Sequence, residues 1–297
     1  AFYRPFLAYD YTSLCVALFI FGMAGSCYAI SLNTLTATIE KQDGFYVMSG
    51  SHGFWSLGGM IGAATGSYVA ATLENPILHI TILVTIILII QTKLKHHYYA
   101  RKSDTVIEKK QKTKLFKPLF VIAVTGLVVM VSEGAIADWS ALYLKKIINL
   151  DGKFLGFGYS AFAFAMMIGR FSGDSLSQKL GSWKLIMYSS LVGISGFLLV
   201  LIINPIVSIF GFFVVGLGFS VVVPEVYRLA SRIEGIKTED GVSFVAATTN
   251  IGFLVGPVIL GFIAELKSLH LSFIILTVYV SSAFFIALAK SRKTAQS

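Results

Sequence analysis

The sequence predicts an all-α protein that crosses a membrane many times, and three observations lead to this prediction. Hydrophobic residues make up 56% of the chain and charged residues only 13%, about half the charged share of a soluble domain. The apolar residues gather in runs that are long enough to span a bilayer as helices. The basic residues, which give a net charge of +9, lie mainly between and after these runs.

Nine apolar spans follow a short mixed segment at residues 1–11. Glycine, alanine and serine are frequent within the spans, as close contact between helices in lipid requires. We expect helices at about residues 12–32, 54–72, 76–92, 118–142, 154–172, 184–203, 206–225, 243–264 and 270–289.

The longest polar segment, residues 93–117, carries nine of the 24 Lys and Arg residues and is interpreted as a solvated linker. If this linker lies in the cytoplasm, alternation of the spans places nineteen basic residues on that side and five on the other. Such a bias is the positive-inside pattern of membrane proteins. The positive charge therefore indicates topology, with a cytoplasmic C-terminus, and requires no nucleic-acid partner.

The cysteine and histidine residues suggest neither a disulfide nor a metal site. Cys15 and Cys27 fall twelve residues apart in the first span, too far apart on one helix to bond, so we expect buried free thiols. No cluster of Cys or His has metal-ligand spacing, and no cofactor is expected. A polytopic membrane enzyme is a rival interpretation, but the sequence contains no HExxH or GxSxG motif.

An internal repeat links distant segments of the chain at a constant offset of 194 residues. The matching pairs are Gly22 and Gly216, Ile39-Glu40 and Ile233-Glu234, Gly58 and Gly252, and Gly62 and Gly256. Spans one to three then correspond to spans seven to nine. On this logic three helices would precede Ala1, residues 1–92 form part of an N-terminal half, and residues 118–297 form a complete six-helix half.

This organisation resembles that of the major facilitator superfamily, with nine of its twelve transmembrane helices present. In that superfamily two six-helix halves enclose a solute site near the midplane of the membrane. The segment IGRFSGDSLSQKLG, residues 168–181, resembles the family's cytoplasmic gating motif, and GFLVGPVILG, residues 252–261, resembles its glycine–proline helix motif. The matching gating positions are Gly169, Arg170, Gly173, Asp174, Lys179 and Gly181.

Three segments resemble, more narrowly, a bacterial inner-membrane branch of sugar- or rhizopine-type permeases. They are the region of Asn33, SHGFWSLGGMIGA at residues 51–63 and SEGAIADWSALYL at residues 132–144. Many members of this branch have an aspartate where this chain has Ala29, which argues against carrying over the charge chemistry of the first half. The resemblance implies a monomeric transporter of a small-molecule solute in a bacterial inner membrane.

Two carboxylates lie within the apolar run from residue 118 to residue 142. Glu133 lies nine residues before Leu142, about 14 Å along a helix, and therefore near the membrane midplane. Asp138 lies nearer the outer end. Ionisable groups at such depth usually face a cavity or a charged partner. We expect a site for proton coupling or solute binding at Glu133 and Asp138, with a structural pairing between helices as the alternative.

Five further polar or aromatic residues are candidates for the solute cavity. Asn33 and Asn250 can hydrogen-bond to a hydroxylated ligand or, alternatively, to neighbouring helices. Trp55 and Trp139 can stack on a sugar or serve in ordinary aromatic packing. His52 can relay protons, although a capping or interfacial role is the alternative.

The charged residues of the gating motif lie one helical turn apart. Arg170 and Asp174 share a helix face and can pair locally, or they can latch the cytoplasmic gate by contacting a neighbouring helix end, as the resemblance implies. Glu225 and Arg228 follow Pro224 at a helix end and are interpreted as gate or interface residues.

The sequence therefore predicts a secondary-active transporter of a small polar solute, sugar-like and with proton coupling as an option. Three alternatives remain open: an exporter of small organic compounds, a membrane enzyme, and a remnant without transport activity.

Overall fold

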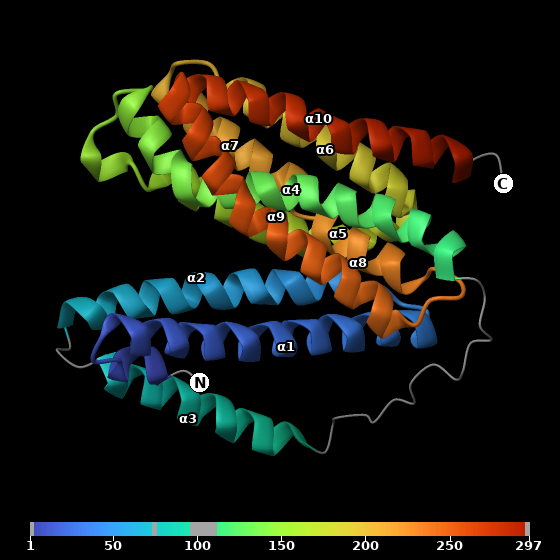
Figure 1. Ribbon diagram of the computed structural model, residues 1–297, viewed down its shortest axis with the longest axis horizontal. Helices are drawn as coiled ribbons and strands as arrows, with labels where there is room; N and C mark the ends of the chain where they lie inside the picture. Colours follow the sequence, from blue (N-terminus) through green and yellow to red (C-terminus); the bar gives the residue numbers. More distant parts are fainter. Residues whose placement is uncertain (1–2, 73–75, 96–111, 295–297) are drawn as a thin grey trace. The chain divides into compact units, whose positions relative to one another are not determined.

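A computed structural model of the chain describes residues 3–72, 76–95 and 112–294. This part of the chain forms helices joined by turns and short connecting segments and contains no strand, so the all-α prediction is confirmed (Figure 1). The helices are α1 (Tyr11–Asp43), α2 (Met48–Thr72), α3 (Pro76–Leu94), α4 (Lys112–Lys146), α5 (Phe157–Leu180), α6 (Ser182–Val200), α7 (Pro205–Phe219), α8 (Val222–Ser231), α9 (Thr238–Leu266) and α10 (Leu269–Thr294).

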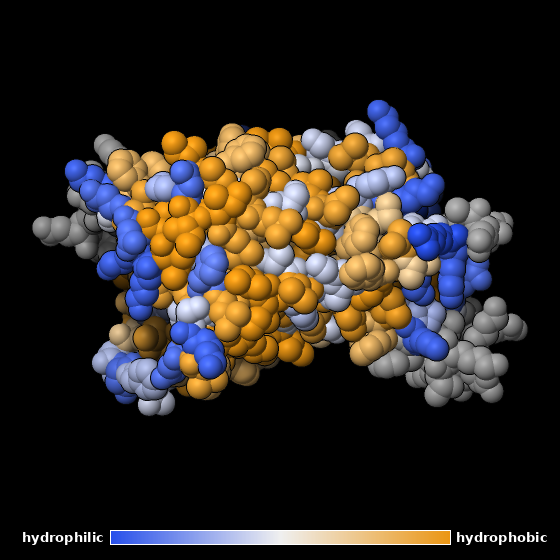
Figure 2. All heavy atoms as spheres, turned by 90° about the horizontal axis from the view of Figure 1, so that it is seen from above, coloured by the Kyte–Doolittle hydropathy of each residue, from blue (hydrophilic) through white to orange (hydrophobic). Residues whose placement is uncertain are grey.

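Each predicted span coincides with one helix, except that the seventh is divided into α7 and α8. Eight helical segments of the described chain are long and apolar enough to cross a membrane. The α2 helix is not among them, because its six glycines and four serines lower its hydropathy. On the face drawn in Figure 2, hydrophobic residues cover the middle of the protein and hydrophilic residues gather toward the two ends.

Contacts divide the chain into two units. The first comprises residues 1–33 and 57–105, and the second comprises residues 34–56 and 106–297. The predicted boundaries at residues 92 and 118 stay a prediction, and the contacts add that residues 34–56 group with the second unit. Most of the basic linker at residues 93–117 lies outside the described residues.

The first unit begins its long helix with a side-chain cap. The backbone N–H of Ser13 donates to Asp10 Oδ1 over 2.6 Å, and the Ser13 hydroxyl accepts from the backbone N–H of Asp10. The hydrogen bonds from Ser13, first from its backbone and then from its side chain, lower the pKa of the Asp10 carboxyl. Further along α1, Cys15 and Cys27 are free thiols but exposed, so the prediction that they are buried is wrong.

The second unit is held together by close contacts at glycines. The α4 and α9 helices lie side by side (Figure 1). A Cβ atom on Gly252 would come within 2.9 Å of the Leu127 carbonyl oxygen, and one on Gly256 within 2.9 Å of Val131 Cα. The glycine–proline segment of α9 therefore lies directly on the α4 backbone, which positions the stretch of α4 that carries Glu133.

Candidate functional site

The most connected polar group of the second unit surrounds Arg228 on α8, whose side chain is fully buried. Its Nε and Nη2 donate to the two oxygens of Glu40 over 2.7 and 2.8 Å, and Nη2 also donates to Asp174 over 2.6 Å. Nη1 donates to Ser177 over 2.9 Å and to Glu225. We call Glu40, Asp174, Ser177, Glu225 and Arg228 the Arg228 network.

Two carboxylates of this network also hold the start of α2. Glu40 Oε1 accepts the backbone N–H groups of Val47 and Met48, both over 2.7 Å. Asp174 accepts those of Ser49 and Gly50, over 3.0 and 2.7 Å. The first N–H groups of a helix have no partner within the helix, and the positive end of its dipole favours carboxylates. The network thus fixes the end of α1 and the start of α2 to α5 and α8.

The glycines of the predicted gating motif allow α5 to approach its neighbours. A Cβ atom on Gly173 would lie 2.7 Å from Val221 Cγ1 and 2.8 Å from Ser49 Cβ, and one on Gly169 would lie 2.7 Å from Ser220 Cβ. Gly181 ends α5 with a φ of +76°, a conformation that side chains other than glycine rarely adopt. These glycines therefore have packing and turn roles that position Asp174.

An aromatic ring covers the network. The Tyr46 ring centroid lies 4.5 Å from Arg228 Cζ and 5.0 Å from Arg232 Cζ, within the range of cation–π contact. Arg232 also lies 3.8 Å from Glu40 Oε2, with 39% of its side chain exposed. It is thus a second cation at the exposed edge of the network.

A second group of charged residues comprises Glu133 on α4 and Arg170 on α5. Arg170 is 7% exposed, its Nη1 donates to Ser56 Oγ, and its Nε has no partner among the described residues. Its charge interacts with Glu133 on α4 and with Tyr159 on α5. Glu133 is partly exposed, whereas Arg170 is buried. Arg170 joins α5 to α2 through Ser56, and its charge acts on Glu133 of α4.

His52 lies beside this pair. Its ring stacks on Tyr227 with 5.8 Å between the ring centroids, and the charge of Arg170 acts on it. The His52 Nε2 atom is buried and has no hydrogen-bond partner among the described residues.

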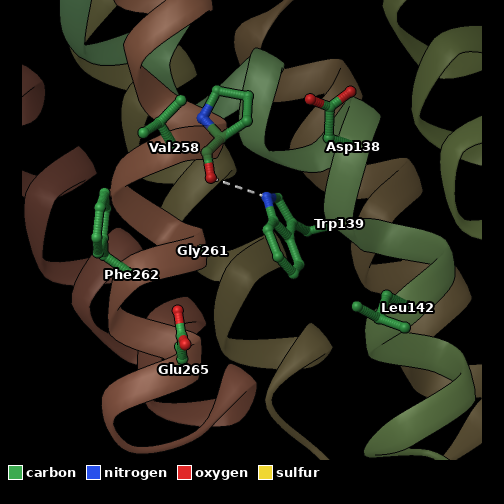
Figure 3. Close-up of a pocket in the computed structure, with 8 residues that line it drawn as sticks. Asp138, Trp139, Leu142, Val258, Gly261, Phe262 and Glu265 are labelled. Atoms are coloured by element: carbon green, nitrogen blue, oxygen red, sulfur yellow. Dashed lines mark hydrogen bonds between the residues drawn. The ribbon is translucent and has the colours of Figure 1, made fainter.

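A pocket of about 530 Å³ opens between α4 and α9 (Figure 3). The indole Nε1 of Trp139 donates to the Pro257 carbonyl oxygen over 3.0 Å, which fixes the ring at the pocket wall. Gly261 leaves space for the ring, since a Cβ atom there would lie 3.0 Å from Trp139 Cζ2. The lining residues are Asp138, Trp139, Leu142, Pro257, Val258, Gly261, Phe262 and Glu265. The pocket therefore combines two carboxylates with two aromatic rings.

The structure separates the residues predicted for the cavity into groups. Asp138 and Trp139 share the pocket, whereas Glu133 and His52 do not line it and lie within range of the charge of Arg170, a predicted gating residue. Asn250 is exposed on α9 and does not line this pocket. Asn33 belongs to the first unit, and Trp55 is 66% exposed.

One of the two predicted options, a local ion pair between Arg170 and Asp174, does not form. Arg170 instead reaches Ser56, and Asp174 reaches Arg228 and the start of α2. Sequence reasoning did not identify Glu40, Ser177 or Glu265 as site residues. Glu40 had one signal, its place in the repeated Ile-Glu pair, but nothing in the sequence indicates that it meets Arg228.

Comparison with known proteins gives consistent matches. The family model described as Major Facilitator Superfamily matches residues 2–233. An uncharacterized MFS-type transporter of Yersinia pestis is 31% identical over 270 residues, which cover 88% of this chain and 68% of that protein. The quinolone resistance protein NorA of Staphylococcus aureus is 30% identical over 154 residues, which cover 51% of this chain and 39% of that protein. The solved fucose:proton symporter FucP of E. coli superposes with a TM-score of 0.79 at 15% identity, covering 96% of this chain and 78% of that one.

Proposed function

Because this chain belongs to the Major Facilitator Superfamily, a family of membrane transporters, we propose that it moves a small polar solute by secondary-active alternating access. As a multi-pass membrane transporter it is not an enzyme, and the rival interpretation is set aside. We propose in addition the class of solute, the coupling of transport to protons and the orientation of the chain in the membrane.

The observation that carries this proposal is that Glu133 and Arg170 place opposite charges within range of each other on α4 and α5. An acid and a base halfway along membrane-spanning helices are costly to place there and are retained where they serve transport. Glu133 is partly exposed, and the charge of buried Arg170 acts on it. Protonation of Glu133 would leave Arg170 without that counter-charge. This change in pairing is the step through which we propose that a proton drives the transporter.

The Arg228 network fits the role of a gate at the cytoplasmic side. It joins residues 34–56 to α5 and α8 through one buried arginine, so opening this end requires several charge-assisted bonds to break together. Breaking and re-forming such a lock gives alternating access two distinct states. We place this end and the C-terminus in the cytoplasm of a bacterial inner membrane, as the distribution of basic residues favours.

The α4–α9 pocket favours a sugar-like solute. The carboxylates of Asp138 and Glu265 can accept hydrogen bonds from hydroxyl groups, and the fixed Trp139 ring offers a flat apolar face. FucP, which shares the fold, is named as a fucose:proton symporter.

Export of small organic compounds is a second candidate. It is favoured by the match to NorA, whose name connects that protein with quinolone resistance. The pocket's aromatic rings would also suit an apolar compound. The direction of pH-driven movement distinguishes the two candidates, because a proton gradient directed inward drives uptake by a symporter and expulsion by a proton-exchanging exporter.

The test uses the purified full-length protein in proteoliposomes, with radiolabelled L-fucose, D-glucose and D-xylose as uptake probes and ethidium as an export probe. Glu133→Gln keeps the size and hydrogen-bonding capacity of the side chain but cannot titrate. We expect it to abolish accumulation driven by a pH gradient while exchange at equal concentrations continues. Asp138→Asn, on the same helix but in the proposed solute pocket, should weaken solute binding while a pH gradient still drives accumulation. Normal pH-driven accumulation by Glu133→Gln would refute proton coupling at this residue.

A further inference from the structure

The Arg228 network contains more negative than positive charge. Three carboxylates, those of Glu40, Asp174 and Glu225, accept from the single guanidinium of Arg228. A second cation, Arg232, contacts Glu40 at 3.8 Å from the exposed edge. If these three carboxylates and two guanidinium groups were all ionised, together they would carry one net negative charge. A buried charge without a counter-charge is unfavourable, and such a group commonly binds a proton instead.

Hydrogen bonds indicate which carboxylate is neutral. Glu40 and Asp174 each accept N–H donors at both oxygens, as an ionised carboxylate does. Glu225 differs, because only its Oε1 accepts from Arg228. Its Oε2 is buried without a hydrogen-bond partner, and the residue is 0% exposed. A neutral carboxyl group can accept through Oε1 and hold its hydrogen on Oε2.

From this geometry we propose that Glu225 is a proton-binding site inside the Arg228 network, neutral when the network is closed and ionised when it opens. Closing removes Glu225 from water beside two other carboxylates, and a proton on its free oxygen balances the charge. Opening returns Glu225 to water, where an ordinary glutamate loses its proton at neutral pH.

The surroundings of Glu225 contain hydroxyl groups and exposed charged groups. The hydroxyls of Ser177 on α5 and Ser182 on α6 lie beside its carboxyl. Among the described residues of the second unit, the other charged groups at this end are Lys41 and Asp43 on α1, Lys117 on α4, Lys179 on α5, Lys184 on α6, Glu234 and Lys237 between α8 and α9, Glu239 and Asp240 on α9, and Lys290, Arg292 and Lys293 on α10. Lys179 and Lys184 are exposed, and no ion pair connects either of them to Glu225, so they do not balance its charge in place of a proton.

The inference rests on the proposed gate and adds a regulatory consequence. The proton enters and leaves Glu225 at the same end of the helices, so it is not carried across the membrane. It therefore regulates the gate: acidification on this side favours the closed network, and alkalinisation favours the open one. Each pH unit can shift that balance by about tenfold, the limit for one linked proton.

A direct test is infrared spectroscopy of the purified full-length protein at pH 7, which resolves the C=O stretch of neutral carboxyl groups from that of carboxylates. The spectrum should contain a neutral-carboxyl band that is lost in Glu225→Gln and retained in Glu234→Gln, a control at an exposed carboxyl near the same helix end. The band should also be lost in Asp174→Asn. In that variant the negative charges of Glu40 and Glu225 equal the positive charges of the two arginines, so no proton is needed for neutrality. Identical spectra of the original protein and Glu225→Gln would overturn the proposal, as would survival in Asp174→Asn of the band that depends on Glu225.

A second measurement separates this inference from the gate itself. A cysteine reporter at buried Ala37 on α1, with Cys15 and Cys27 replaced by serine, reacts with a maleimide only when this end opens. The thiol itself reacts faster at higher pH, so each rate is divided by the rate of the same reporter in Glu225→Gln. This ratio of alkylation rates should increase as the pH rises. A reporter that never reacts would refute the gate, and with it the regulatory role of Glu225. Alkylation that shows no pH dependence relative to Glu225→Gln would refute only the proton site.

Discussion

Arg228→Lys conserves the positive charge at the centre of the network but removes the planar set of five N–H donors that a guanidinium offers. Arginine makes five hydrogen bonds here, to four side chains, whereas a lysine ammonium offers three donors from one atom. At least two charge-assisted bonds are therefore lost, each worth about 1.5 kcal/mol at the low end of the usual range. We expect the closed network to lose about 3 kcal/mol, which corresponds to about 150-fold more of the open form.

The assay is the maleimide reaction of the Ala37→Cys reporter at fixed pH, since its rate follows the population of the open form when opening is fast. Arg232→Lys is the matched control. That side chain is 39% exposed and makes one long contact with Glu40, so its loss should cost less than about 1 kcal/mol. Equal reporter rates in the two variants, with helical content unchanged by circular dichroism, would refute the idea that Arg228 holds the end closed.

Three further predictions concern the gate, the packing and the topology. Asp174→Asn should lower transport turnover more than solute affinity, because gating controls conformational rates; a large loss of binding with unchanged turnover would contradict this. Gly256→Ala should lower the thermal unfolding temperature, at a cost of about 1–3 kcal/mol, because its methyl group meets the α4 backbone. Gly58→Ala, where a Cβ meets no described atom within 4 Å, is the control and should not lower it. Single cysteines at Thr105 and Asn149 should react from opposite sides of the membrane, and labelling from one side would overturn the proposed topology.

The helices could be predicted from the sequence because lipid imposes long apolar runs and leaves few alternatives. The glycine–proline segment of α9 could also be interpreted in advance, since Gly252 and Gly256 at i, i+4 spacing predict a close helix contact. The division of the seventh span at Ser220–Val221 could not, because the hydropathy of the run is continuous across it. That break matters, since it places Glu225 and Arg228 on a separate short helix.

The partners of charged residues were much less predictable than the helices. Arg170 and Asp174 were identified by their motif, but their spacing suggested a local pair. The tertiary structure instead offers each a partner far away in sequence, 114 residues for Ser56 and 54 for Arg228. Local spacing reports only which residues share a face, whereas the buried pairing is decided by which helices meet there. The same limit explains why Glu40, 188 residues from Arg228, was not recognised as a site residue.

The position of Arg170 and Asp174 on one face of α5 connects the two proposed parts of the mechanism. Both act on the start of α2: Arg170 through the Ser56 hydroxyl, and Asp174 through the backbone N–H groups of Ser49 and Gly50. The Ser49 hydroxyl also donates to the Arg170 carbonyl oxygen over 2.7 Å. If Glu133 carries the coupling proton, the change in its interaction with Arg170 acts on α2 at Ser56, about two turns beyond the N–H groups that the gate holds. A substitution that uncouples them, Ser56→Ala, should therefore leave solute exchange intact while weakening its dependence on the pH gradient. Unchanged pH-driven accumulation in that variant would mean that the two charged groups work independently.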